Sequence, residues 1–367
     1  MRRFLGLRGI LMKALFVKTL LAILGSCIFA AAGLGTNAAA QGSAEVSRQV
    51  LARVIPVPST VSPQMQKVMA APPDVIMAPK TTAEWKALIG ARAKMDLAGI
   101  DSLEKQFDVA VQPRLIANVP CFVIAPRIVP DRNRNRLLLN VHGGAYVFGS
   151  GVGGAMEGIL MAGHAHMKVI AVDYRMPPDF PYPAAMDDAM AVWREVVKMA
   201  KPANMAIFGT STGGGMTLAM VQRAIKEGLP LPAAIAPGTP WSDLSKTGDS
   251  YFTNESVDNV LVSYDGLLSA AAKLYAGMLD LKDPRISPVY GDFHGFPPAI
   301  LTTGTRDLFL SNTVRVHRKL REAGVVSQLE VYEGQSHAQY FPDPSAPESV
   351  EVFDAIAKFF DEHLGYR

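Results

Sequence analysis

Short apolar runs alternate along the chain with longer stretches in which apolar and polar residues follow helical spacing. The apolar runs, which are typical of strands, are Cys121 to Ala125, Leu137 to Val141, Val169 to Asp173, Met205 to Gly209, Ala233 to Ala236, Ala299 to Thr303 and Gln328 to Tyr332. Helical spacing is found between them, for example at Met216 to Glu227 and at Asn312 to Ala323. Strands that alternate with helices are typical of a mostly parallel sheet wrapped by helices. The pattern therefore predicts an α/β fold.

A second, helical pattern precedes the first of these strands. It covers Glu45 to Ile55, Ser62 to Ala70, and a helix that opens at Thr81 and runs to about Leu97. Thr81-Thr82-Ala83-Glu84 has the spacing of a capping box, in which the threonine and the glutamate each satisfy a backbone N–H at the helix start. Another segment, Thr247 to Leu281, interrupts the alternation between two strands.

Residues 1–40 have a different character. Five basic residues come first, namely Arg2, Arg3, Arg8, Lys13 and Lys18. An apolar stretch of 16 residues, 19–34, follows, and Ala38-Ala39-Ala40 then offers a small-residue cleavage site. This order is typical of a secretory signal peptide, and the apolar stretch is short for a membrane span. We predict that residues 1–40 are a signal peptide and that the mature chain is periplasmic or secreted, with no stable membrane span.

A lipid anchor is the alternative, because Leu24-Gly25-Ser26-Cys27 loosely resembles a lipobox, which would anchor the chain through Cys27. After cleavage at Ala40 only Cys121 remains, so that form has no intramolecular disulfide.

Composition agrees with one large domain that carries additional helices. Of the 367 residues, 49% are hydrophobic and 19% are charged, enough to bury a sizeable core. The formal net charge is +3, and it becomes −2 when residues 1–40, with their five basic and no acidic residues, are removed. The basic character therefore belongs to the leader, and the sequence indicates no nucleic-acid partner.

The first candidate for chemistry is Gly209-Thr210-Ser211-Thr212-Gly213, a Gly-x-Ser-x-Gly motif between a predicted strand and a predicted helix. A serine becomes a useful nucleophile when a sharp turn exposes its hydroxyl to a base. Glycines two residues before and after it let that turn form without Cβ clashes. The motif alone also fits an ordinary turn, but its position between strand and helix favours Ser211 as the nucleophile.

A glycine-rich loop, His142-Gly143-Gly144-Ala145-Tyr146, directly follows the predicted strand Leu137 to Val141. Acyl transfer builds negative charge on the carbonyl oxygen, and each preset N–H donor that stabilises it is worth roughly 3 kcal/mol. We expect Gly144 and Ala145 to donate their N–H groups, Gly143 to shape the loop, and Thr212 to supply a third donor. The alternative is a simple glycine turn after a strand.

A nucleophilic serine needs a histidine base and a carboxylate that orients the base. Asp307 follows the predicted strand Ala299 to Thr303, and His337 follows the predicted strand Gln328 to Tyr332. Both therefore lie in loops at the carboxyl ends of strands, where open α/β sheets gather their sites. The sequence predicts a catalytic triad of Ser211, Asp307 and His337.

The other histidines and acids have simpler explanations. His142 belongs to the glycine loop and is expected to brace it. His164 and His166 do not share a helix face and have no acid or cysteine beside them, so we predict no metal site. Surface or packing roles are the default for His294, His317 and His363. Other acids between Ser211 and His337 lack the combination of a preceding buried strand and a following helix, namely Asp243, Asp249, Asp258, Asp265, Asp280, Asp283 and Asp292.

With these motifs the chain resembles the hormone-sensitive-lipase-like branch of the α/β-hydrolases, which includes many bacterial esterases. Asp173 to Ala185 is similar to that branch's Tyr-Arg-x-x-Pro-Glu-x-x-Phe-Pro-Ala signature. The resemblance extends over roughly residues 105 to 362 and includes Trp241-Ser242-Asp243-Leu244, Ile286-Ser287-Pro288 and Gly295-Phe296-Pro297-Pro298. Two positions differ, because Ala145 replaces the third glycine of the usual His-Gly-Gly-Gly and Thr212 replaces the more usual alanine. Both residues keep their backbone N–H.

The resemblance implies how the chain is organised. Residues 105–367 would form an α/β-hydrolase catalytic domain, and residues 41–104 would form helices of a cap to which 247–281 contributes. Several large side chains are available to line an acyl pocket or to pack the cap on the core, namely Met65, Met69, Met77, Trp85, Met278 and several leucines.

Together these features predict a serine carboxylic-ester hydrolase. It would act on small-molecule esters with short to medium acyl groups, through an acyl-enzyme intermediate and without a metal or organic cofactor. A lactone hydrolase or another reaction on the same fold is the alternative, because fold does not fix function. A non-catalytic ligand-binding protein is favoured only where a triad residue is missing. The sequence leaves a homodimer open.

Overall fold

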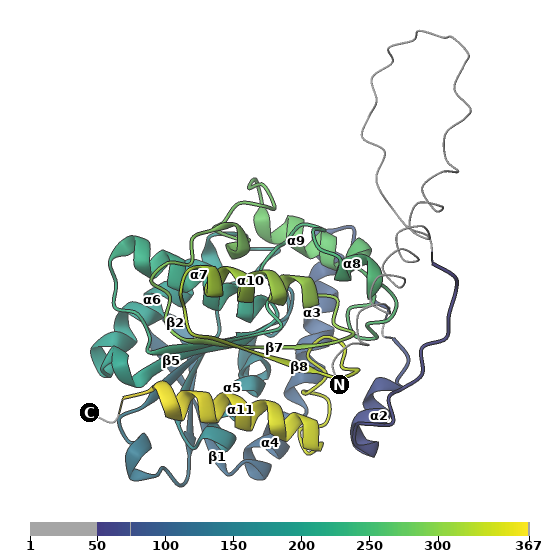
Figure 1. The fold of residues 1–367 in the computed structure, drawn as a ribbon. Coiled ribbons are helices and arrows are strands. Elements are labelled where there is room, and N and C mark those ends of the chain that lie inside the picture. Colours follow the sequence, from purple (N-terminus) through teal and green to yellow (C-terminus); the bar gives the residue numbers. More distant parts are fainter. Residues whose placement is uncertain (1–49, 74, 366–367) are drawn as a thin grey trace, which may run out of the picture. The chain divides into compact units, whose positions relative to one another are not determined.

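The computed structural model describes residues 50–73 and 75–365 and divides the chain into two units, Met1–Val54 and Ile55–Arg367 (Figure 1). The predicted signal peptide and Cys27 lie outside the described residues. The helix predicted over Glu45 to Ile55 is wrong where it can be compared, because residues 50–58 form no helix. Pro56 and Pro58 explain the difference, since the residue before a proline is driven away from helical dihedral angles.

The core of the unit Ile55–Arg367 is an eight-stranded sheet in the order β1-β2-β4-β3-β5-β6-β7-β8. The strands are β1 Val109–Ile116, β2 Val119–Pro126, β3 Leu137–Val141, β4 Lys168–Val172, β5 Met205–Thr210, β6 Ala234–Gly238, β7 Ala299–Gly304 and β8 Ser327–Tyr332. β1 and β2 pair antiparallel, β2 and β4 pair antiparallel, and all other neighbours are parallel. The predicted mostly parallel α/β sheet is confirmed, and every predicted strand is present with its ends shifted by at most about two residues, the usual boundary uncertainty.

The sequence pattern did not predict β1. This edge strand pairs with β2 alone, and most of its side chains are exposed, including those of Pro113 and Arg114. Its residues therefore show neither the continuous apolar run of a buried strand nor a clean alternation of apolar and polar positions.

Helices cover both faces of the sheet. They are α2 Pro63–Met69, α3 Thr82–Leu97, α4 Ile100–Gln106, α5 Met156–Ala165, α6 Ala184–Met199, α7 Thr212–Glu227, α8 Ser250–Thr253, α9 Ser269–Ala276, α10 Leu310–Glu322 and α11 Pro347–His363. α5 and α11 pack on one face, and α6, α7 and α10 pack on the other (Figure 1). Side chains of β3 alternate accordingly, since Leu137 and Leu139 enter one apolar cluster and Leu138 enters the other.

The N-terminal helices start where the sequence predicts. Thr81 Oγ1 accepts a hydrogen bond from Glu84 N (3.2 Å), and the Glu84 carboxylate accepts one from Thr81 N (3.1 Å), so the capping box of α3 is confirmed. α2 is fixed to the start of α11, because the Glu348 carboxylate accepts hydrogen bonds from both Ser62 N and Ser62 Oγ at 2.6 Å. These helices belong to the same unit as the sheet.

A buried polar network lies between α5 and the middle of the sheet. The Glu157 carboxylate accepts hydrogen bonds from Thr210 Oγ1 (2.7 Å), Thr210 N (3.2 Å) and Asn140 Nδ2 (3.2 Å). The Thr210 hydroxyl also bonds to the Tyr340 hydroxyl at 2.8 Å. Burial disfavours the charged carboxylate and raises the pKa of Glu157 from 4.5 to about 7, although these hydrogen bonds oppose the shift.

The pKa of Glu157 predicts how stability depends on pH. The Glu157 carboxyl keeps its proton up to about pH 7 in the folded chain but loses it near pH 4.5 in the unfolded chain. Its contribution to the free energy of unfolding is therefore fully present below pH 4.5 and is lost as pH rises through 7. The loss should be on the order of 3 kcal/mol, and Glu157→Gln should remove it. Urea unfolding at pH 5 and pH 7.5 measures the difference. Glu362→Gln, at an exposed position of α11, is the matched control, and parallel pH dependence in wild type and Glu157→Gln would contradict the assignment.

Candidate active site

Ser211 occupies a sharp turn between β5 and α7. Its φ of 64° and ψ of −122° lie outside the regions that most side chains adopt. The turn presses the chain against the end of β3, because a Cβ added at Gly209 or Gly213 would lie 2.1 Å or 2.0 Å from the Val141 carbonyl oxygen. Both motif glycines are therefore required by close packing.

The glycine-rich loop lies directly beside this turn. A Cβ added at Gly143 would lie 2.7 Å from the Thr210 carbonyl oxygen, so the loop and the turn touch through their backbones. Gly144 has a φ of 110° and Ala145 a φ of 54°, which folds the loop tightly around the end of β3. Thr212 is the first residue of α7, so its backbone N–H has no acceptor within the helix.

His142 braces the glycine-rich loop from behind. Its ring stacks on Tyr174 with centroids 4.1 Å apart, and Nδ1 lies 2.7 Å from the Gly143 carbonyl oxygen. Tyr174 donates a hydrogen bond to the His142 carbonyl oxygen at 2.6 Å. Burial lowers the pKa of His142 to about 4, so the ring is neutral near pH 7 and Nδ1 is the donor to Gly143.

Asp307 and His337 are in direct contact. His337 Nδ1 lies 3.1 Å from Asp307 Oδ1, and the Asp307 side chain is fully buried. Asp307 also accepts hydrogen bonds from Phe309 N (2.8 Å), from Thr303 Oγ1 (2.9 Å) and from the Thr239 hydroxyl. The carboxylate is thus held on several sides and presents one oxygen to the imidazole.

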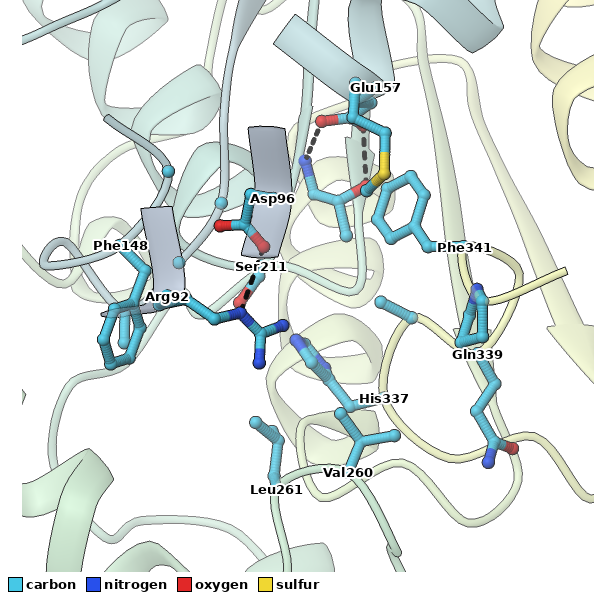
Figure 2. A pocket seen from close by; sticks show the side chains of 18 of the residues that line it. Arg92, Asp96, Phe148, Glu157, Ser211, Val260, Leu261, His337, Gln339 and Phe341 are labelled. Atoms are coloured by element: carbon cyan, nitrogen blue, oxygen red, sulfur yellow. Dashed lines mark hydrogen bonds and ion pairs between the residues drawn. The ribbon is translucent and has the colours of Figure 1, made fainter. Parts of the chain in front are cut away.

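Ser211 and His337 line one cavity of about 790 Å³, together with Gly143, Gly144 and Ala145 (Figure 2). Among the described residues, no hydrogen bond joins the Ser211 hydroxyl to His337. Figure 2 shows Val260 and Leu261 on the His337 side of the cavity and Phe148 on the opposite side. The volume suits a small organic ligand.

The methionines and the tryptophan proposed from the sequence for an acyl pocket do not line this cavity, whereas Leu261, Leu267 and Leu268 do. Met65 and Met69 pack against Ala346 in a small cluster of their own, Trp85 belongs to the main core, and Met77 and Met278 are exposed. The cavity wall from the N-terminal region instead contains Val68, Ala71, Pro72 and Ile76. Their smaller side chains gave no distinctive signal in the sequence.

The sequence pattern did not assign a role in the site to three residues that lie near Asp307 and His337. Thr239, just after β6, contacts both Asp307 and His337 Nδ1, the latter at 2.9 Å. Asn254 donates a hydrogen bond to the Asp307 carbonyl oxygen at 2.8 Å. Asp258, which lacks a preceding strand, is fully buried beside the same loops. Only Thr239, at the carboxyl end of a strand, had a position that signals a site.

The two histidines of the His-x-His sequence, for which no metal site was predicted, have other contacts. His164 Nδ1 lies 2.8 Å from the Asp354 carboxylate, and His166 is the left-handed C-cap of α5. Within the described ranges, no group of three or more His, Cys, Asp or Glu side chains is placed to hold a metal ion.

Over residues 50–73 and 75–365, the structure contains no helix with the length and apolar character needed to cross a membrane.

Comparisons with known proteins agree with this architecture. A family model described as alpha/beta hydrolase fold matches residues 138–341. An acetyl-hydrolase of Streptomyces hygroscopicus is 30% identical over 237 residues, which are 64% of this chain and 79% of that protein.

Solved structures are similar over most of the chain. The crystal structure of an esterase called E25 has a TM-score of 0.84 and 41% identity, and the match covers 87% of this chain and 99% of that one. The crystal structure of an esterase from the bacterial hormone-sensitive lipase family has a TM-score of 0.71 and 27% identity, over 83% and 99% of the two chains. The chain therefore belongs to the α/β-hydrolase family, in the branch of the bacterial hormone-sensitive-lipase-like esterases.

Proposed function

We propose that this chain is a serine carboxylesterase in which Ser211 is the nucleophile, His337 the base and Asp307 the carboxylate that orients the base. The observation that carries the proposal is that the Ser211 turn, the glycine-rich loop and the hydrogen-bonded pair of His337 and Asp307 meet at one cavity. Family membership and the esterase names of its relatives support the same reaction class.

In the proposed mechanism His337 Nε2 takes the proton of the Ser211 hydroxyl while Oγ bonds to the acyl carbon. Asp307 stabilises the imidazolium through Nδ1, and the N–H groups of Gly144, Ala145 and Thr212, in a loop shaped by Gly143, bind the developing oxyanion. The ester C–O bond then breaks, and the alcohol leaves with the proton from His337. Water attacks the acyl-enzyme with help from the same imidazole, which releases the acid and restores the Ser211 hydroxyl.

The substrate range is proposed from the walls of the cavity. Ala145 adds a methyl group where the branch usually has glycine, and α2, α3 and the segment around Leu261 enclose the far side. A cavity of about 790 Å³ with walls on these sides limits the length of the acyl chain that it can hold. The acetyl-hydrolase of Streptomyces hygroscopicus, named for a two-carbon acyl group, is consistent with short acyl substrates.

We also propose the domain organisation and location predicted from the sequence. Residues 41–104, with 247–281, form a cap on the catalytic domain 105–367, and Val68, Ile76 and Leu261 are cavity residues from these segments. Residues 1–40 act as a signal peptide that delivers the mature chain to the periplasm or the medium, with anchoring through Cys27 as the alternative.

Ser211→Ala should lower kcat on p-nitrophenyl butyrate by about four to six orders of magnitude, because attack loses its only activated oxygen. Circular dichroism and thermal melting should show an intact fold. Ser102→Ala, an exposed serine of α4, is the control and should keep full activity. Retention of a tenth of wild-type turnover in Ser211→Ala would refute the assignment.

The rate should depend on pH through the proposed base. kcat/KM should rise with pH as the His337 imidazole loses its proton, because only the neutral ring accepts the proton of Ser211. A pH series of initial rates measures this rise. Chelators should leave the rate unchanged, whereas loss of activity with chelator and recovery with zinc would transfer the chemistry to a metal site.

The preferred length of the substrate's acyl chain tests the proposal that the cavity limits substrate size. With p-nitrophenyl esters of graded length, kcat/KM should be highest for acyl groups of about two to eight carbons and should fall steeply beyond them, because the cavity has a limited depth. Rapid turnover of long-chain triglyceride emulsions, with a jump in rate at the oil–water interface, would show that the cavity opens widely and would contradict this prediction.

A further inference from the structure

Asp258 is a buried carboxylate for which the proposed mechanism has no use. It lies in the irregular segment between α8 and α9, and its side chain is fully inaccessible to solvent. Burying an isolated carboxylate is costly, so a charge in this position needs several donors around it. Asp258 has four, and all of them are backbone N–H groups.

The donors come from three different parts of the chain. Asp258 Oδ1 accepts hydrogen bonds from Val260 N (2.9 Å) and Leu261 N (3.0 Å) in its own segment. Asp258 Oδ2 accepts one from Leu308 N (2.8 Å) and one from His337 N (3.2 Å). One carboxylate thus links the residue after Asp307, the backbone of His337, and two residues that line the cavity.

Nearby contacts reinforce the same link. Asn254 binds the Asp307 carbonyl oxygen at 2.8 Å, and Asp258 N donates to the Asn254 carbonyl oxygen at 3.0 Å. On the other side, Asn259 N donates to Ser336 Oγ at 3.2 Å, next to His337. The segment 254–259 therefore contacts both loops that carry the proposed acid and base.

Asp258 also acts on His337 through its charge. Burial and the negative charge of Asp307 raise the pKa of Asp258, and the positive imidazolium of His337 and the backbone hydrogen bonds oppose this shift. Four N–H donors favour the carboxylate form, because a protonated acid would leave one of them without an acceptor. A carboxylate at this position makes the imidazolium that forms during catalysis more stable.

We propose that Asp258 is a second carboxylate of the site, a positioning residue that holds the loops of Asp307 and His337 together and stabilises the protonated form of His337. The proposal rests on the proposed esterase mechanism. Val260 and Leu261 line the cavity (Figure 2), so the carboxylate that binds their N–H groups also connects the substrate-binding wall to the base.

Other charged groups face His337 and must stay constant in the test. Asp307 contacts its Nδ1, and the cavity walls contribute Lys67 from α2, Arg92 and Asp96 from α3, Glu157 from α5, and Asp343. These lining residues surround the same space as the imidazole. None of them is changed by a substitution at Asp258, so a difference between the pH profiles of variant and wild type reports Asp258.

Asp258→Asn tests the proposal in the full chain. The amide keeps the shape but replaces one acceptor oxygen with an NH2 group that faces N–H donors. kcat for p-nitrophenyl butyrate, expressed per site titrated with a fluorophosphonate, should fall about 10- to 100-fold with a change in KM below about threefold, because a small displacement of the base is costly. The acidic limb of kcat/KM should move to lower pH by about half a unit or more, since the imidazolium has lost a nearby negative charge.

Asp249→Asn removes an exposed carboxylate just before α8 and should change neither readout. If Asp258→Asn does not fold, Asp258→Ser provides the same two readouts, because serine is small, accepts a hydrogen bond and carries no charge. An unchanged kcat per titrated site and an unshifted acidic limb would overturn the proposal and leave Asp258 a purely structural residue. The esterase mechanism itself is tested separately by Ser211→Ala, so the two failures are distinguishable.

Discussion

The site depends on one close contact, that of the Val141 carbonyl oxygen with the backbone at Gly209 and Gly213. No side chain fits at either position, because a Cβ would lie about 2 Å from that oxygen. The contact fixes the end of β3 against the turn between β5 and α7. Ser211 and the glycine-rich loop are therefore placed relative to each other by the parallel pairing of β3 with β5, which leaves little freedom to the loops themselves.

The negative charges of the site are balanced by dipoles. In the described part of the chain, neither Asp307 nor Asp258 forms an ion pair with a lysine or an arginine, and both are fully buried. Backbone N–H groups and the hydroxyls of Thr239 and Thr303 bind them instead. Fixed dipoles hold a carboxylate without adding a competing positive charge, so the neighbouring His337 is stabilised when it becomes positive.

Much of this organisation could be predicted from the sequence because it is local. The apolar runs identify strands buried on both faces, and the Thr81 capping box identifies the start of α3. Ser211, Asp307 and His337 stand out because each follows a strand. Asp258 could not be found in this way, since the N–H groups of Leu308 and His337 that define it lie 50 and 79 residues away along the chain. The cavity wall at Val68 and Ile76 was missed because small apolar residues have many roles.

The exposed edge strand β1 has a consequence for solubility. An edge strand presents unpaired N–H and C=O groups that another chain can bind, and long apolar edges promote aggregation. Pro113 has no N–H to offer, and Arg114 places a charge beside it on an exposed stretch of β1. The residues that made β1 hard to predict from the sequence thus discourage sheets of different molecules from joining at this edge, which lies at the end of the sheet farthest from β7 and β8.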